Sequence, residues 1–306
     1  MTGSGRAALA AIGAWLAGAA WASAQVYRGG TDTVLLNVTV TDATGRFIPD
    51  VNQDEFQIFE DNQPQTITVF SRDPQPIALS LLVDASTSME QRLPIAQDAA
   101  IGFVRRMKKT DLTQVVEFNS EVQIRQDFSG DPAVLESAIR RIRASGSTSL
   151  YNATYVALSG LKRMKATSPS ELRRQAIVIL SDGEDTTSLV NYDEVLDAAK
   201  RSEVIVYAIG LRSKEPVSRR VGGYNEAEFV LRTLAQQTGG RAFFVDDPAQ
   251  LAAVYTQIAD ELASQYLIGY SSRNTRRDGA WRAIVLRSTR ANTAARTKAG
   301  YFSATR

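Results

Sequence analysis

The chain has 306 residues, enough for one large or two modest domains with a hydrophobic core. Its 35 Lys and Arg residues nearly balance its 33 Asp and Glu residues, which argues against a general role in binding polyanions. It contains neither Cys nor His, which excludes a Ser-His-Asp triad, a Cys nucleophile, a His general base and the usual zinc or iron sites. Any bound metal must therefore have oxygen ligands, and catalysis is disfavoured.

Residues 1–24 have the pattern of a secretory signal peptide. One basic residue, Arg6, precedes an apolar stretch over residues 7–21, and Ala22-Ser23-Ala24 places small residues three and one before a cleavage point. An uncleaved membrane anchor is the alternative, which the shortness of the apolar run disfavours. We therefore expect an exported chain, periplasmic or secreted, that begins at Gln25 and has no transmembrane segment when mature. It contains no disulfide, so its core alone must stabilise it.

Residues 34–70 have the pattern of short β-strands and turns. The segment LLNVTVTD alternates apolar and polar residues, and FQIFEDNQPQTITVF predicts two strands around Asp61 and Asn62. No helical periodicity is present. We expect an N-terminal β segment over residues 25–75 that ends at a proline-flanked link.

The stretch IALSLLVDASTSM predicts the central element of the chain. Its apolar run, which ends at Asp84, is typical of a strand buried on both faces of a sheet. Asp84, Ser86 and Ser88 follow at alternate positions, so their oxygens can converge on a small divalent cation if the chain turns there. The same residue types also form turns and helix N-caps, so this string alone does not decide between the two interpretations.

Helical and strand patterns then alternate as far as residue 264, which predicts an α/β domain over residues 76–265. Alternation of this kind indicates a doubly wound, mostly parallel, Rossmann-like sheet with right-handed crossovers. The expected helices span residues 94–107, 132–142 (with Asp131 as N-cap), 151–164, 192–201, 228–238 and 248–264, and the expected strands span residues 77–84, 114–118, 122–126, 176–180, 204–209 and 242–245.

Residues 266–306 return to strand patterns, at 266–270, 281–286 and about 298–302. We expect this C-terminal β segment to pack with residues 25–75 into a small β-sandwich. Two separate β units are the alternative, although each is thin for a core. The segment carries nine basic residues and a single acidic one, Asp278. Contact with anionic envelope components is the functional interpretation of this charge, and a solvated outer sheet face is the simpler one.

Ligands of doubly wound sheets bind beyond the carboxyl ends of the strands, where the strand order reverses. A second apolar strand ends just before Asp182, and the loop of residues 144–149 leads into the helix before that strand. If the two strands are neighbours, their loops face each other. The side chains brought together would be Asp84, Ser86, Ser88, Thr148 and Asp182.

The segments DASTS, GSTSLY and LSDGED resemble, in residue type and order, the metal-ion-dependent adhesion site of the von Willebrand factor type A domain. The resemblance covers about residues 76–264, and the whole layout is similar to bacterial exported proteins related to that domain. It implies a domain that binds Mg²⁺ or Mn²⁺. Ser86, Ser88 and Thr148 would lie near the metal, and Asp84 and Asp182 would hold it directly or through water.

The charges of these residues indicate what such a site would do. Two carboxylates balance a divalent cation and the hydroxyls are neutral, so the ion keeps an open position that an Asp or Glu carboxylate of a partner protein can fill. We expect a non-enzymatic protein-binding module with no nucleic-acid partner. One alternative is a Mg²⁺-dependent phosphoester hydrolase using Asp84 or Asp185, although the chain has no Walker-type glycine loop. The other is an exported scaffold whose metal is purely structural.

Two further features leave alternatives open. Glu184 and Asp185 are groups supporting the site, catalytic carboxylates or, as we favour, solvated charges at the start of the next segment. The loop of residues 212–225 is either a partner-specificity loop or a loop without a partner. Its residues of the types favoured in interfaces are Arg219, Arg220 and Tyr224.

Overall fold

The computed structural model describes residues 33–164, 173–212, 220–221 and 224–305. The expected signal peptide over residues 1–24 lies outside the described residues. Within the described ranges, no helix is long and apolar enough to cross a membrane.

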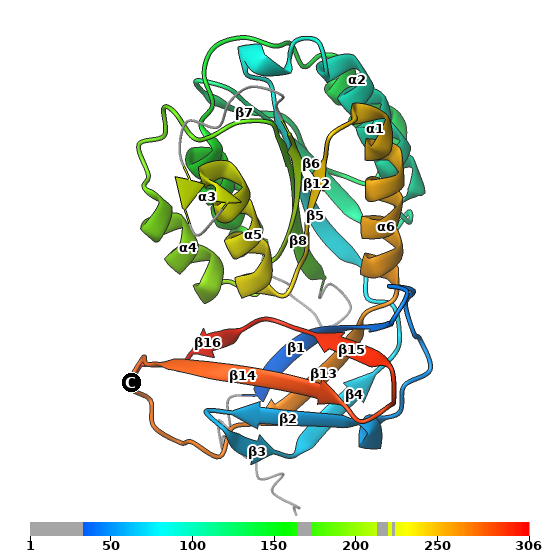
Figure 1. Cartoon of the computed structure of the whole chain (residues 1–306), viewed down its shortest axis with the longest axis vertical. Helices are drawn as coiled ribbons and strands as arrows, with labels where there is room; N and C mark the ends of the chain where they lie inside the picture. Colours follow the sequence, from blue (N-terminus) through cyan, green and yellow to red (C-terminus); the bar gives the residue numbers. More distant parts are fainter. Residues whose placement is uncertain (1–32, 165–172, 213–219, 222–223, 306) are drawn as a thin grey trace, which may run out of the picture. The chain divides into compact units, whose positions relative to one another are not determined.

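A six-stranded sheet with the order β12-β9-β8-β5-β6-β7 forms the centre of the α/β region (Figure 1). Neighbouring strands are parallel except for β6 and β7, which pair antiparallel. The strands are β5 (Ile77–Asp84), β6 (Leu112–Phe118), β7 (Val122–Ser129), β8 (Arg174–Ser181), β9 (Ile205–Leu211) and β12 (Ala242–Val245). The predicted α/β fold class, with a doubly wound and mostly parallel sheet, is confirmed.

All eight residues of β5 are buried, which explains why its sequence is apolar except for Ser80 and the terminal Asp84. Alternate side chains enter different cores. Leu79 and Leu81 pack on one face of the sheet, and Ala78 and Leu82 pack on the other. The strand is therefore covered on both faces.

The two faces of the sheet are covered by different sets of helices (Figure 1). On one face lie α1 (Leu93–Arg106), α2 (Pro132–Arg140) and α6 (Leu251–Ala263). On the other lie α3 (Leu150–Arg163), α4 (Tyr192–Arg201) and α5 (Glu226–Thr238). Asp131 caps α2 as expected, because its carboxylate accepts the Ala133 N–H at 2.9 Å.

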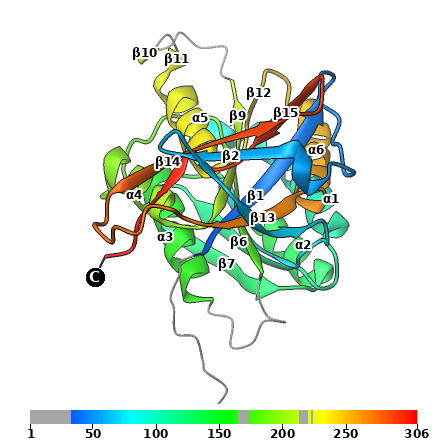
Figure 2. The same ribbon diagram turned by 90° about the horizontal axis from the view of Figure 1, so that it is seen from below.

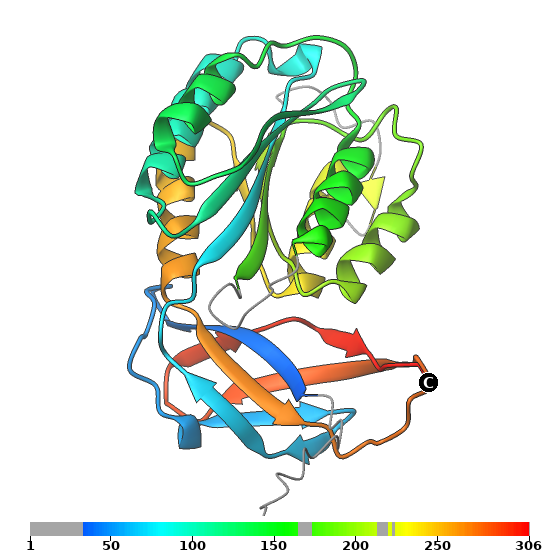
Figure 3. The ribbon, with the colours of Figure 1, turned by 180° about the vertical axis from the view of Figure 1, so that it is seen from behind.

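Strands from both ends of the chain form two four-stranded sheets, β15-β1-β13-β4 and β16-β14-β2-β3 (Figure 2). The strands are β1 (Thr33–Asp42), β2 (Phe56–Glu60), β3 (Gln63–Gln65), β4 (Ile67–Ser71), β13 (Tyr266–Ser271), β14 (Trp281–Ser288), β15 (Thr293–Arg296) and β16 (Gly300–Phe302). In Figure 3, β1 (blue) lies beside β13 (orange), its antiparallel partner. The β-sandwich that we predicted from the two ends of the chain is therefore present, and the domain limits at residues 75/76 and 265/266 stay predictions.

The sandwich differs from the prediction in two details. Residues 56–71 contain three strands, where we expected two. After the turn at Asp61 and Asn62, whose φ angles are +47° and +66°, β3 pairs with β2, whereas β4 pairs with β13 in the other sheet. The chain thus passes from one sheet to the other within a segment that looks like one strand. An alternation of apolar and polar residues does not predict such a change of sheet. Strand β15 was also missed, because its sequence TAAR has only one residue typical of strands.

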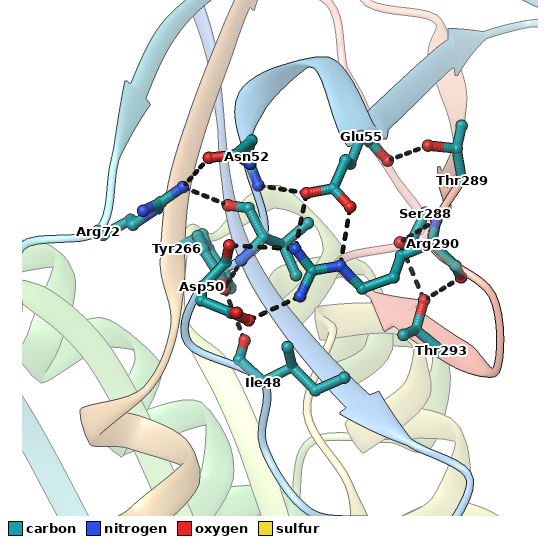
Figure 4. Close-up of polar contacts among 11 residues, drawn as sticks. Ile48, Asp50, Asn52, Glu55, Arg72, Tyr266, Ser288, Thr289, Arg290 and Thr293 are labelled. Atoms are coloured by element: carbon teal, nitrogen blue, oxygen red, sulfur yellow. Dashed lines mark hydrogen bonds and ion pairs between the residues drawn. The ribbon is translucent and has the colours of Figure 1, made fainter.

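A polar cluster holds the loop between β1 and β2 (Figure 4). Arg290 donates to both carboxylate oxygens of Glu55, at 2.7 and 2.8 Å, and to Asp50 at 2.6 Å. Tyr266 donates to the carbonyl of Ile48 at 2.6 Å and accepts the Val51 N–H at 3.0 Å. Hydrogen bonds from Arg290 and then from the Asn52 N–H lower the pKa of Glu55 to about 2. Arg290 of the basic C-terminal segment is therefore engaged inside the sandwich.

Candidate metal centre

The candidate site lies where the strand order of the central sheet reverses. Strand β5 leads through α1 to β6 on one side, and β8 leads to β9 on the other. The two strands pair in parallel register, with Val83 opposite Leu180. Asp84 ends β5 and Asp182 directly follows β8, so both carboxylates leave the same edge of the sheet, as predicted.

Hydroxyl groups connect the two carboxylate-bearing loops. The Oγ atoms of Ser86 and Ser88 are 3.0 Å apart, and Ser88 Oγ donates to Asp182 Oδ1 at 2.7 Å. The Ser86 N–H donates to Asp84 Oδ1 at 2.8 Å. Four of the residues that the sequence places at the site thus form one continuous set of contacts.

Asp84 is fully buried, and its second oxygen accepts a hydrogen bond from Ser181 Oγ at 2.5 Å. Burial raises the pKa of Asp84 to about 6, although hydrogen bonds from Ser181 and Ser86 oppose the rise. Sequence reasoning missed Ser181. Its only signal was its position as the last residue of the apolar strand β8.

Thr148 is buried and attached to the loop that follows Asp182. Its carbonyl accepts the Thr186 and Thr187 N–H groups at 2.9 and 3.2 Å, and its own N–H donates to Thr186 Oγ1 at 3.0 Å. A Cβ atom at Gly183 would lie 3.6 Å from Thr148 Oγ1, so the hydroxyl faces the residue directly after Asp182. The segment GSTSLY, which contains Thr148, therefore lies beside the segment LSDGED, which contains Asp182.

Asp185 is half-buried and bonded to its surroundings, which differs from the solvated charge that we expected. Its Oδ1 accepts the Tyr151 N–H at 3.0 Å and the Ser188 hydroxyl at 2.6 Å, and its Oδ2 accepts the Ser188 N–H at 3.2 Å. Asp185 thus fastens its loop to the first turn of α3. The sequence could not show the contact with α3, because the Tyr151 N–H comes from a different segment.

Arg92 is a charged neighbour that sequence reasoning missed. Its Nη1 lies 2.8 Å from Asp182 Oδ2, and the side chains of Arg92 and Asp182 are 25% and 2% exposed. Each oxygen of Asp182 therefore has a partner, Ser88 on one and Arg92 on the other.

The donor set fits a small, hard divalent cation. Mg²⁺ takes octahedral oxygen ligands at about 2.0–2.1 Å, which places adjacent ligands roughly 3 Å apart. The distances of 3.0 Å between the two serine hydroxyls and 2.7 Å from Ser88 to Asp182 match this spacing. Among the described residues, no three or more Asp, Glu, His or Cys side chains form a group that could hold a metal. A cation at this edge would therefore depend on hydroxyl ligands.

The loop of residues 212–225 is only partly described. Residues 213–219 and 222–223, including Arg219, lie outside the described residues, as do the side chains of Arg220 and Tyr224. The described backbone forms a short antiparallel pair, β10 (Arg220–Val221) with β11 (Tyr224–Asn225). Its suggested role in partner specificity stays a prediction.

The sheet order and the oxygen cluster at its switch point define a Rossmann-like α/β protein with a candidate cation site. The sequence profile of the von Willebrand factor type A domain matches residues 79–257, more than half of the chain. The chain therefore belongs to the von Willebrand factor type A domain family. A search of the curated proteins finds no significant match.

One solved structure with a TM-score above 0.5 agrees with this assignment at the level of the fold, and two others are similar to part of the chain. A von Willebrand factor type A protein from Catenulispora acidiphila is 12% identical with a TM-score of 0.51, over 89% of this chain and 74% of that one. The vWF domain of the type V pili tip protein Mfa5 from Porphyromonas gingivalis is 15% identical with a TM-score of 0.49, over 61% of this chain and 95% of that one. BatB from Bacteroides thetaiotaomicron is 18% identical with a TM-score of 0.45, over 60% of this chain and 98% of that one.

Proposed function

We propose that this chain is an exported, metal-dependent protein-binding module. It captures an Asp or Glu carboxylate of a partner protein through Mg²⁺, or Mn²⁺. The proposed ligands, direct or through water, are Asp84, Ser86, Ser88, Thr148 and Asp182. The observation that carries the proposal is the chain of oxygen contacts from Ser86 through Ser88 to Asp182, which has the spacing of adjacent octahedral ligands.

The chemistry of the donor set supports capture of an anionic group. Asp84 and Asp182 together balance the charge of a divalent cation, and the hydroxyl ligands add none. The cation thus keeps affinity for a further oxygen ligand, and a partner carboxylate is a hard anionic ligand of the preferred type. The family to which the chain belongs typically serves in protein interactions, which agrees with this role.

The loop after Asp182 offers a second contact for a protein partner. Leu189 is 94% exposed, and its backbone is held because Asn152 Oδ1 accepts the Leu189 and Val190 N–H groups, both at 3.1 Å. Ser188 Oγ accepts the Asn152 N–H at 3.0 Å. Because the backbone of this loop is already held, binding costs little further backbone entropy, so Leu189 is suited to enter an apolar pocket of the partner.

A catalytic role has less support. The hydrolase alternative needs a reactive carboxylate, which would be Asp84 or Asp185. Asp185 is occupied by hydrogen bonds from α3 and from its own loop, and Asp84 is fully buried. Envelope contact through the basic C-terminal segment also loses support. Four of its basic residues are engaged in ion pairs: Arg282, Arg290, Arg296 and Lys298. Export itself rests on the sequence pattern of residues 1–24.

The metal centre is tested by thermal unfolding of the protein in EDTA, Mg²⁺, Mn²⁺ and Ca²⁺. A ligand that binds only the native state stabilises it by about 2.7 kcal/mol at a hundred times its dissociation constant. We expect Mg²⁺ and Mn²⁺ to stabilise the wild type but not Asp84→Asn. Asp98→Asn is the matched control, because the Asp98 side chain is 73% exposed on α1. Equal shifts in all three proteins would contradict a metal at this site.

Partner capture is tested by retention of envelope or secreted proteins in Mg²⁺. Proteins bound through the metal must be released by EDTA and must not be retained by Asp84→Asn. Retention that ignores both changes would contradict the metal mechanism. If the metal were purely structural, Asp84→Asn would keep its partners wherever it stays folded.

A further inference from the structure

We propose that Arg92 is a tethered counter-cation of the candidate metal centre, which pairs with Asp182 in the metal-free protein and thereby weakens divalent-cation binding. This inference rests on the proposed function and concerns how strongly the centre holds its ion. It assigns a role to a residue that the sequence shows only as a charge near the start of a helix.

The geometry places Arg92 in direct competition for Asp182. Arg92 Nη1 donates to Asp182 Oδ2 at 2.8 Å, and the side chain of Asp182 is only 2% exposed. A cation that approaches this carboxylate meets an oxygen already bonded to a fixed positive charge. The other oxygen accepts the Ser88 hydroxyl at 2.7 Å, so neither one is free.

The backbone of Arg92 is fixed, so the pair is not an ordinary surface contact. Its N–H donates to the Met89 carbonyl at 2.8 Å, and its carbonyl accepts the Ala96 N–H at 3.0 Å. The neighbouring side chains of Met89 and Leu93 are buried, which anchors the segment on both sides of Arg92. Exposed ion pairs lose much of their energy to side-chain entropy and solvent screening. Here the burial of Asp182 reduces the solvent screening, and the anchored backbone keeps the Arg92 side chain within reach of Asp182.

The charge of the centre shows the effect on a metal. With both carboxylates ionised, Asp84 and Asp182 present two negative charges, and Arg92 reduces the sum to one. An incoming divalent cation is attracted less and is repelled by the guanidinium, and both effects are strong in a partly buried site. The loaded centre would carry one surplus positive charge while Arg92 stays nearby. A partner carboxylate neutralises this surplus, so metal and partner should strengthen each other's binding reciprocally.

Calorimetric titration with Mg²⁺ tests this role. We expect Arg92→Met to bind Mg²⁺ at least about tenfold more tightly than the wild type, which corresponds to about 1.4 kcal/mol. Arg105→Met is the matched control. It removes the same charge from the other end of α1, roughly 20 Å away along the helix, where Arg105 pairs with Glu136. Its dissociation constant should equal that of the wild type.

Thermal unfolding provides a second measurement. Arg92→Met leaves a buried carboxylate without its cation, so its metal-free form should melt below the wild type, and Mg²⁺ should raise its melting temperature more. If Arg92→Met does not fold without metal, Arg92→Lys carries the test. The more strongly hydrated ammonium pairs less well with a carboxylate, so this variant should bind Mg²⁺ more tightly than the wild type.

The outcomes separate this inference from the function on which it rests. If the wild type and Arg105→Met bind Mg²⁺ and the Arg92 variants bind it equally or more weakly, the role of Arg92 is overturned and the metal centre stands. If none of these proteins binds Mg²⁺ at millimolar concentration, the metal centre fails and the role of Arg92 fails with it.

Discussion

Replacement of Asp84 by Asn should stabilise the metal-free protein at neutral pH, although it removes a proposed metal ligand. Burial raises the pKa of Asp84 from 3.8 to about 6, so the folded state favours the protonated carboxyl. Stability therefore falls as the pH rises through this window and stays low above it. Each pKa unit corresponds to about 1.4 kcal/mol, so the ionised carboxylate costs about 3 kcal/mol at neutral pH.

Asparagine fits the same hydrogen-bond positions without a charge. Its Oδ1 can accept the Ser86 N–H that Asp84 accepts at 2.8 Å. The hydroxyl of Ser181, which donates to Asp84 at 2.5 Å, can turn and accept from the new amide. Asp84→Asn should therefore gain up to about 3 kcal/mol in EDTA at neutral pH.

Urea unfolding in EDTA, followed by circular dichroism between about pH 4 and about pH 8, measures this difference. The wild type should lose stability relative to Asp84→Asn as the pH rises to about 6, and the gap should then stay constant. Asp98→Asn controls for the loss of one negative charge. Parallel curves for the wild type and Asp84→Asn, or a less stable variant at neutral pH, would refute the reasoning.

Three further predictions concern other parts of the chain. Glu261 is buried and accepts hydrogen bonds from Thr39, Tyr207 and Arg296, so Glu261→Gln should lower the free energy of unfolding, measured in urea, by about 1–3 kcal/mol. The exposed Glu203→Gln is the control and should change it by less than about 0.5 kcal/mol. Equal effects of the two substitutions would contradict this prediction. Because the pKa of Glu55 is lowered to about 2, this group stabilises the fold above its ordinary pKa of 4.5 and the contribution is lost as the pH falls. In an acid titration followed by near-ultraviolet circular dichroism, Arg290→Met should thus unfold at a higher pH than the wild type. Identical curves for the two proteins would exclude this contribution of Glu55. Leu189→Ser should leave the melting temperature unchanged and reduce partner retention in Mg²⁺, whereas full retention would remove Leu189 from the interface.

The fold was predictable where burial alone determines the residue types. Strands β5 and β8 are buried on both faces, so each appears in the sequence as an apolar run, and the carboxylates after them mark the edge of the sheet. The exchange of sheets between β3 and β4 was not predictable, because both are short and neither is fully buried. Their partners, β2 and β13, are fixed by long-range pairing rather than by local pattern.

The candidate site was predictable for short side chains that leave the ends of neighbouring strands. Asp84 and Asp182 lie at strand ends, so strand order alone brings them close. Arg92 and Ser181 were not predictable in the same way. The reach of Arg92 to Asp182 depends on the turn between β5 and α1, and Ser181 acquires its role only through the proximity of Asp84.

The cost of the site without metal separates the three functions that the sequence left open. A core selected for stability alone would not bury Asp84 beside a second carboxylate, because a buried charge is unfavourable unless it is paired. If a metal only stabilised the fold, Asp84→Asn would relieve the same cost by itself and would keep its partners. If the metal binds a partner, the variant would be stable and yet retain nothing. A phosphoester hydrolase would lose turnover in the same variant, so stability, retention and turnover of Asp84→Asn together distinguish the functions.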